Sequence, residues 1–507
     1  MCVPRPIDRA VAGQLVLPGV YERSSPIEAK RWGRLFSFPC EMSRLMRMSL
    51  GFVARVAGLC GFLLTVGAGA HAADLLRVYE AAVAHDPVLA EARAQLAEDR
   101  AGVPAAWAAL YPHVGAAASV GENRAHVTGI GLPELTDYLS DSYSVTLTQP
   151  LFNGQALSGL GIARAQVRAG EAGLVQARQH LILAVTDAYF GVLKAQADVR
   201  VAKKQERLLG DIYRQARAFL RVGKGDIIAV EEAQANLQAA RSEEIVARNA
   251  VRVARQNLWR LTHRRFSHLE NLGPVQAQLP HPDAVGPWLA AAFTNQPLLR
   301  QARANLRAAR ANVHFQERAM WPTLSIVGEA QHGLGLLLPR VEVNQVGASL
   351  DLSVPIYQGG GVSANTQRAQ AAVAVSQNRL RDIRDAIRTE TTTAFLNLQS
   401  SVSELDAARA AKDAARISLH ATRKGYEVGV RSIIDVLSTA TQFAAAERSY
   451  NLALYDQIVA RVALKSAAGV LEPEDIAAIN ALLIRRARAR VWHRGAAAAR
   501  RGYPSGE

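Results

Sequence analysis

A pair of histidines and a run of glycines have residue types that could carry out chemistry, but neither group has the spacing that such chemistry needs. His263 and His268 lie in the basic segment THRRFSHLE, which lacks the HExxH arrangement of a zinc hydrolase. No GxSxG, Walker or GxGxxG arrangement follows a predicted strand. We therefore expect no catalytic residue, no metal site, no cofactor and no enzymatic activity.

The glycine run at 359–361 is a candidate phosphate-binding loop, because glycines between a strand and a helix can cradle an anion. The run lacks the lysine and the second glycine of a P-loop. It also matches QPLFNG at 149–154, a strand-to-helix corner in the first half of the chain. We interpret the run as a backbone bend.

A secretory leader precedes the fold. Residues 42–72 contain arginines, then an apolar stretch from Val56 to Val66, then the small residues Ala70-His71-Ala72, which is the order of a signal peptide. We predict cleavage between Ala72 and Ala73. We expect residues 1–41 to be an upstream extension that is not translated or not structured.

The distribution of charge and cysteine points to an envelope protein. The formal charge is +15, of which the first 72 residues hold +5 and the last 24 hold +6, so a nucleic-acid partner is not expected. The arginine-rich end of a C-terminal segment at 471–507 is interpreted as a solvated tail. Removal of the leader removes every cysteine, which suits an oxidising compartment; the cysteines are Cys2, Cys40 and Cys60.

The chain is duplicated at an offset of about 205 to 210 residues. Four landmarks recur in the same order, namely HDPVLAEARAQL (85–96) and NQPLLRQARANL (295–306), Tyr111-Pro112 and Trp321-Pro322, QPLFNG (149–154) and VPIYQG (354–359), and VGKGDIIAV (222–230) and VGVRSIIDV (428–436). We predict a first structural repeat at 73–283 and a second at 284–470. Each should contain a helix, a β-hairpin, a long helix, a turn and a second helix.

Apolar residues recur every 3.5 residues in both predicted long helices. Alternating steps of four and three from Leu174 to Leu220 meet twelve apolar residues in fourteen, and the same frame moved by 206 residues meets nine. A heptad pattern of this length is typical of a coiled-coil seam, so the helices should lie side by side. The proline-free stretch from Ala156 to Leu220 would form a rod of about 100 Å.

Two segments alternate with a period of two residues, which predicts strands. Tyr143, Val145 and Leu147 alternate with polar residues, and so do the apolar residues at 348–354. Weaker strands precede them near 114–120 and 324–329, which gives four strands. They could form a small soluble sheet that caps the helices. If they cross a membrane, several copies must share one barrel, because known membrane barrels have about eight strands or more.

The duplicated landmarks, the strand ends PLF and PIY, the turns VG-x-x-x-I-I and the leader together resemble the TolC family of outer-membrane export channels, over residues 74–483. The resemblance implies a mostly α fold with a small β part. Long helices would form a coiled-coil-like α-barrel in the periplasm. Each protomer of a homotrimer would add four β-strands to a shared 12-stranded transmembrane β-barrel in the outer membrane of a Gram-negative cell.

The resemblance also implies function and partners. The trimer would lie in outer-membrane lipid and dock onto a periplasmic adaptor and an inner-membrane ABC or proton-driven transporter. It would serve type I secretion or multidrug efflux, with an RTX-toxin exporter as the favoured subtype. The alternative is a soluble periplasmic coiled-coil adaptor, which would also have a leader and helical hairpins.

Gate residues are implied where the second helical hairpin turns, namely Tyr426, Arg431 and Asp435. A carboxylate repeated by symmetry makes a charged ring in a narrow pore, and bonds from Arg or Tyr can hold neighbouring helices shut. Asp435 could equally be an exposed charge in the first turn of a helix, where Asp is favourable.

Two positions depart from the family pattern. Ser438 and Ala229 stand where well-known family members carry aspartate, and Asp226, one turn before Ala229, is a candidate substitute. A weaker negative ring is implied. Gly223 and Gly429 are interpreted as turn glycines.

Overall fold

The computed structural model describes residues 73–125, 136–273, 277–335 and 341–484, which fall within one compact unit. The predicted leader, with its cleavage site after Ala72, lies outside these residues, and so does the arginine-rich tail from Arg485. Ala73 is the first residue described. Its backbone N–H donates to the carbonyl of His268 at 2.8 Å.

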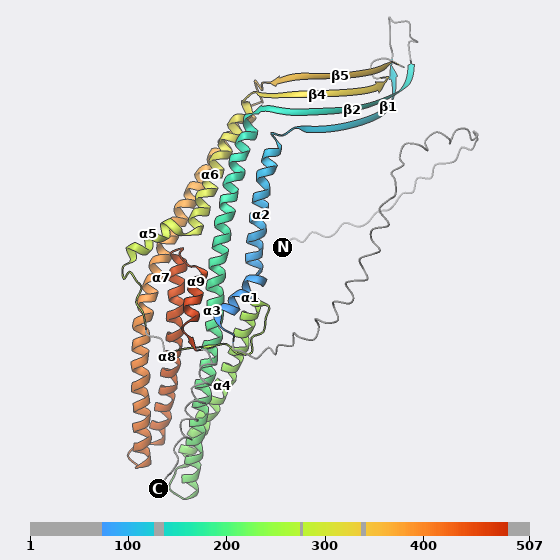
Figure 1. Ribbon diagram of the computed structural model, residues 1–507. Coiled ribbons are helices and arrows are strands. Elements are labelled where there is room, and N and C mark those ends of the chain that lie inside the picture. Colours follow the sequence, from blue (N-terminus) through green and yellow to red (C-terminus); the bar gives the residue numbers. More distant parts are fainter. Residues whose placement is uncertain (1–72, 126–135, 274–276, 336–340, 485–507) are drawn as a thin grey trace, which may run out of the picture. The chain divides into compact units, whose positions relative to one another are not determined.

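The two halves of the chain contain the same elements in the same order (Figure 1). The first half has α1 (Leu75–His85), α2 (Pro87–Ala108), β1 (His113–Ala125), β2 (Thr136–Asn153), α3 (Gly154–Arg221) and α4 (Ile227–Thr262). The second half has α5 (Val285–Asn295), α6 (Pro297–Glu317), the 3₁₀ turn η1 (Arg318–Met320), β4 (Thr323–Leu334), β5 (Glu342–Ser353), α7 (Gly361–Glu427) and α8 (Ile433–Ala467). The duplication seen in the sequence is therefore also a duplication of the structure.

The long helices α3 and α7 have 68 and 67 residues and carry the predicted seams. The Asn153 side chain caps α3 by accepting the N–H of Ala156 at 2.9 Å. Thirteen of the 28 heptad positions are buried, among them Leu181, Val185, Val192, Ala202 and Leu209 in α3 and Ile387, Leu398, Leu405 and Leu419 in α7. Helix α3 packs against α2, α4, α6 and α8 along its length. The prediction of helices packed side by side is confirmed.

The four predicted strands form one antiparallel sheet in the order β1-β2-β4-β5. They are longer than the alternation indicated, since β2 runs from Thr136 to Asn153 rather than over 143–148. One expectation was wrong at its end: Val354 was assigned to the last strand, but β5 ends at Ser353 and residues 354–358 have no regular structure. Gly359 and Gly360 then take φ of 60° and 79°, which makes the backbone bend before α7.

A central core ties the two ends of the described chain to the long helices. Tyr189 and Phe190 of α3 are fully buried in it, and the Tyr189 hydroxyl donates to the carbonyl of Glu270 at 2.8 Å. The two-residue strands β3 (Asn271–Leu272) and β6 (Leu483–Ile484) pair beside this core. They were not predicted, because such short strands leave no periodic signal in a sequence.

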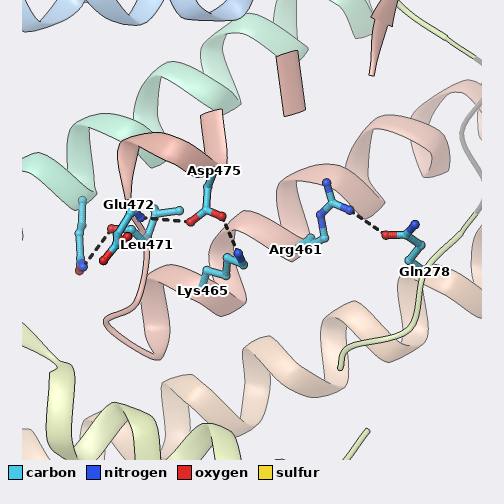
Figure 2. Close-up of polar contacts among 7 residues, drawn as sticks. Gln278, Arg461, Lys465, Leu471, Glu472 and Asp475 are labelled. Carbon is cyan, nitrogen blue, oxygen red and sulfur yellow. Dashed lines mark hydrogen bonds and ion pairs between the residues drawn. The ribbon is translucent and has the colours of Figure 1, made fainter. Parts of the chain in front are cut away.

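The short helix α9 (Pro473–Asn480) was also not predicted, and polar contacts hold it against α8. Figure 2 shows Lys465 of α8 paired with Asp475, whose second oxygen accepts the N–H of Glu472 at 3.1 Å. Arg461, which also lies in α8, donates to the side chain of Gln278, in the linker between α4 and α5, at 3.1 Å. The linker and the C-terminal helix are thus both fastened to α8.

Candidate functional site

In its part near the helices, the sheet has one apolar and one polar face across all four strands; farther out, the first face also carries Glu122, Asp137, Asp141, His332 and Asn344. Directly opposite residues share a face, and the pairing Val114↔Leu147, Leu147↔Gly328 and Gly328↔Ala348 continues across the whole sheet. The apolar face carries Val114, Ala116, Val120, Tyr143, Val145, Leu147, Leu324, Ile326, Val346, Leu350 and Leu352. The other face carries Ser119, Asn123, Ser142, Ser144, Thr146, Glu329, Gln331, Gln345, Ser349 and Asp351.

The apolar face of the sheet is uncovered in a single chain. Val346 is 88% exposed, and Leu350 and Leu352 are 64% and 65% exposed. No helix packs on the sheet among the described elements. An exposed apolar surface of this extent marks a place where lipid or protein binds.

Aromatic side chains mark the level at which the strands meet the helices. The ring of Trp321 stacks on Phe152 with centroids 6.2 Å apart, and the Arg318 guanidinium lies 4.9 Å from the centre of the Trp321 ring. Just before β1, Tyr111 stacks on Trp107. Aromatic side chains at this level fit the boundary between an apolar and an aqueous medium.

The two helical hairpins turn in the same way at the far end of the helices. Gly223 and Gly429 have φ of 71° and 80°. The N–H of Gly223 donates to the Leu220 carbonyl at 3.0 Å, and the N–H of Gly429 donates to the Tyr426 carbonyl at 3.0 Å. Both glycines therefore end a helix in the left-handed conformation that residues with a Cβ avoid. We call the residues 219–230 and 425–438 the tip.

Asp435 and Asp226 both serve as helix caps at the tip. Asp435 forms a capping box with Ser432: its carboxylate accepts the Ser432 N–H at 3.1 Å, and its own N–H donates to the Ser432 hydroxyl at 3.1 Å. Asp226 begins α4, and its carboxylate accepts the Ile228 N–H at 3.2 Å. Asp226 occupies the position of Ser432 in the other repeat, not that of Asp435.

Tyr426 joins the two hairpins, while Arg431 lies within its own turn. The Tyr426 ring lies 6.2 Å from the Phe219 ring of the first hairpin, and burial raises the pKa of its phenol. Arg431 packs its Cβ and Cγ into the space that Gly425 leaves open. Among the described residues no ion pair or hydrogen bond links the Arg431, Asp435 and Tyr426 side chains to one another. Ser438 is exposed and accepts from Gln442 at 3.4 Å.

A shared core fixes the two hairpins together just behind the turns. It contains Leu209, Ile212, Ala216, Val230, Leu237, Leu419, Ile433, Val436 and Leu437. Beyond it the turns expose apolar side chains, namely Val222, Ile227, Ile228, Val428, Val430 and Ile434, of which Val430 is the most exposed at 78%. Sequence reasoning missed this surface, although the motif VG-x-x-x-I-I itself contains apolar residues where a turn would usually be polar.

In the described part of the chain, no group of three or more His, Cys, Asp or Glu side chains could hold a metal ion. None of the described helices is long and apolar enough to cross a membrane.

Comparison with known proteins adds to this geometry. The family model described as "Outer membrane efflux protein" matches twice, over residues 78–262 and 288–470. The outer membrane protein TolC of Vibrio cholerae is 27% identical over 82% of this chain and 95% of its own length. The alkaline protease secretion protein AprF of Pseudomonas aeruginosa is 28% identical over 83% of this chain and 89% of its own.

Solved structures show the same fold. The Campylobacter jejuni CmeC outer membrane channel superposes with a TM-score of 0.70 at 18% identity, over 81% of this chain and 90% of that one. The mostly helical, duplicated fold is confirmed, and the channel interpretation is supported over a soluble periplasmic adaptor. The names of the relatives fit the expectation of a protein without enzymatic activity. The chain belongs to the outer membrane efflux protein family and is an outer-membrane channel whose helices extend into the periplasm.

Proposed function

We propose that three copies of this chain form one conduit for export across the outer membrane. The observation that carries the proposal is the four-stranded sheet with an exposed apolar face, a polar face and two open edges, at β1 and β5 of the described chain. Open edges are not tolerated in lipid, and four strands are too few to close a barrel. Three copies would place the apolar faces in lipid and the polar faces around a 12-stranded pore.

The tip is the proposed contact with a periplasmic adaptor, which would connect the channel to an inner-membrane ABC or proton-driven transporter. In support, the two turns expose apolar side chains such as Val222, Val428 and Val430 at the end of the helices opposite the sheet. Apolar side chains that water surrounds in the free protein gain free energy when a partner covers them.

The tip is also the proposed gate. Asp435 from each copy would contribute one charge to a ring in the pore, and Tyr426 and Arg431 would hold the second hairpin against its neighbours. Asp226 and Ser438 would line the same constriction, with Ser438 adding no charge. The capping box does not oppose this role, because a carboxylate that accepts one N–H keeps its negative charge.

The proposed cargo is protein delivered by type I secretion, with RTX toxins as the favoured class, rather than a small drug. In support, one relative that covers most of the chain is named as a protease secretion protein. The choice of RTX toxins rests on the resemblance of the sequence to TolC-family export channels. Deletion of the gene should abolish secretion of such a protein while leaving drug susceptibility within about twofold, and the reverse result would identify a drug channel.

Membrane fractionation tests the proposed function. Expressed with its leader, the chain should sediment with the outer membrane and migrate as a heat-resistant trimer after detergent extraction. In a planar lipid bilayer the extracted protein should form ion-conducting pores. Release of the chain together with a periplasmic marker would contradict the proposal.

A further inference from the structure

A groove between α3 and α6 is lined mainly by arginines. Its volume is about 340 Å³, within the range of small-molecule sites. Arg300, Arg303 and Arg307 lie on one face of α6, since residues three and four apart on a helix are neighbours. Arg168 of α3 lines the same groove. We call these four residues and the space between them the arginine groove.

The charges of these arginines are not neutralised within the described part of the chain, where no ion pair involves any of the four. Arg300 donates to the Thr294 carbonyl at 3.4 Å and to the side-chain oxygen of Asn295 at 3.2 Å. Arg303 donates to the Phe293 carbonyl at 3.3 Å. These acceptors are neutral, and a guanidinium has five N–H donors, so charge and donors both remain for a ligand.

Glu171 of α3 is the one acid among the residues that line the groove, and it lies 3.6 Å from Arg100 of α2. Four arginines and one glutamate give the lining a formal charge of +3. Like charges three and four residues apart destabilise a helix. An anion that binds in the groove would remove this repulsion.

The duplicated helix shows that packing does not require these arginines. Helices α2 and α6 are counterparts at an offset of 210 residues, and both pack on α3. Arg300 and Arg307 correspond to Ala90 and Ala97. Helix α6 carries four arginines and one glutamate, whereas α2 carries two arginines and three acids. Helix α2 thus has the mixed charges of an ordinary solvated face, and α6 does not.

The groove lies within one chain and away from its edges. Helix α2 packs on α3, α3 on α6, and α6 on α7, so α3 and α6 are the inner pair of this row (Figure 1). A neighbouring copy that joins at α2 or α7 leaves the groove between the inner helices. The inference below therefore does not depend on the number of copies in the channel.

Lipid headgroups are too distant to be the partner of this groove. Arg307 and Arg300 precede Glu317, the last residue of α6, by about 15 Å and about 25 Å along the helix. The aromatic level at Trp321 lies beyond that end. Charges in water are largely screened beyond about 8 Å at physiological ionic strength. The partner is therefore an anion dissolved in the periplasm.

We propose that the arginine groove binds a small water-soluble compound with two phosphate groups. The planar guanidinium matches the oxygens of a phosphate, and four of them can hold two phosphates, two arginines to each. Arg300 and Arg307 begin about 10 Å apart on α6, so two anionic groups engage both more readily than one does. Two phosphate groups carry a charge of about −3 to −4, which balances the +3 of the lining.

Calorimetric titration of the full chain, extracted from outer membranes in detergent and kept in phosphate-free buffer, tests the proposal. Inorganic pyrophosphate is the probe, and orthophosphate is compared with it. One pyrophosphate should bind per chain, at least about tenfold more tightly than orthophosphate, because only pyrophosphate has two phosphate groups. Equal affinities, or no binding of pyrophosphate at millimolar concentration, would overturn the proposal.

Paired arginine variants locate the site. Arg300→Ala/Arg307→Ala gives α6 the residues of its counterpart α2 and should weaken pyrophosphate binding at least about tenfold. The control is Arg409→Ala/Arg416→Ala, which removes two exposed arginines at the same spacing in α7. It should leave the affinity within about twofold. An equal loss in both variants would show that the charge of the whole molecule, and not the groove, attracts the anion.

Glu171→Gln tests the groove in the opposite direction. It removes the one acid of the lining and should raise the affinity for pyrophosphate several-fold. Arginines that served only to support the helices would give no such gain, so an unchanged or lower affinity would contradict the proposal. Native mass spectrometry of each variant shows whether the particle still assembles, which keeps this test separate from that of the proposed trimer.

An acidic peptide separates a phosphate compound from a polypeptide ligand. Hexaglutamate carries more negative charges than pyrophosphate but no phosphate, and it should bind the wild-type chain more weakly. Tighter binding of hexaglutamate would assign the groove to an acidic polypeptide and overturn the proposed ligand class.

Discussion

Asp435 has a role in its own helix and is proposed to have a second one in the assembled pore. In a single chain its carboxylate completes a capping box with Ser432. Its counterpart in the first repeat is Ala229, while Asp226 corresponds to Ser432, so the first hairpin lacks the box. The sequence identified Asp435 from the family resemblance and also anticipated a helix-start role, but the partner in the box became visible only in the structure.

Replacement of Asp435 can separate these two roles. Asp435→Asn keeps an oxygen that accepts the Ser432 N–H but removes the charge, so trimer stability should stay unchanged while the preference of the pore for cations falls. Asp435→Ala should lose the same preference and in addition about 1 kcal/mol of stability. Reversal potentials in planar bilayers and thermal unfolding measure the two effects.

Glu427→Gln is the control for this experiment, because Glu427 is an exposed acid of the same tip that pairs with Lys424 at 2.7 Å. It should leave selectivity nearly unchanged. Equal losses of selectivity in Glu427→Gln and Asp435→Asn would show that general tip charge, rather than a ring of Asp435 side chains, attracts cations.

Asp198 in α3 gives a prediction on pH. Burial raises the pKa of its carboxyl, although Arg448 nearby acts in the opposite direction. A folded-state pKa above the unfolded one means that the charged form costs stability, and this cost grows as pH rises from the unfolded pKa through the folded one. Asp198→Asn should therefore raise the unfolding temperature by a few degrees at pH 8, and the gain should vanish towards pH 4.

Arg448 keeps a second partner in that variant, because it lies 3.6 Å from Glu243. Differential scanning calorimetry at several pH values is the measurement. A lower unfolding temperature at pH 8 would mean that attraction to Arg448 outweighs the cost of burying the charge.

At the scale of elements, the sequence predicted the helices and strands whose apolar pattern repeats over many residues. The seams of α3 and α7 repeat over several heptads, and the sheet strands alternate over several pairs, so both were predictable. The strands β3 and β6 have two residues each and depend on contacts between the linker and the C-terminal segment, far apart in sequence. The end of β5 differs from its prediction because β4, its partner, begins at Thr323 opposite Ser353, and alternation alone does not show where pairing stops.

The tip turns give the prediction at this scale. Gly429→Ala places a Cβ on a residue with φ of 80°, which should cost about 1 to 2 kcal/mol and loosen the second hairpin. Hydrogen exchange of the amides at 425–433 should become faster, with little change in the central core around Tyr189.

Gly191→Ala is the matched control. Gly191 lies within α3, and no neighbouring atom comes within 4 Å of the position that an alanine methyl group would take, so the methyl group has space. Alanine there should stabilise the helix by up to about 1 kcal/mol. Similar acceleration of exchange at the tip in both variants would show that the left-handed conformation of Gly429 is not what holds the turn.

At the scale of the whole molecule, the chain should tolerate loss of its arginine-rich end. Deletion from Arg485 onward keeps β6 paired with β3 and should leave trimers intact on unheated gels. Deletion from Pro473 removes Ile476 and Ile479 from the central core and should prevent stable assembly. Loss of trimers in the shorter deletion would show that the tail takes part in assembly.

The central claim is that identical copies complete one pore, and the mass of the particle extracted from the outer membrane tests it most directly. Native mass spectrometry of the detergent-extracted protein should give three times the mass of the mature chain. A particle with the mass of a single chain, stable in buffer without detergent, would contradict the account.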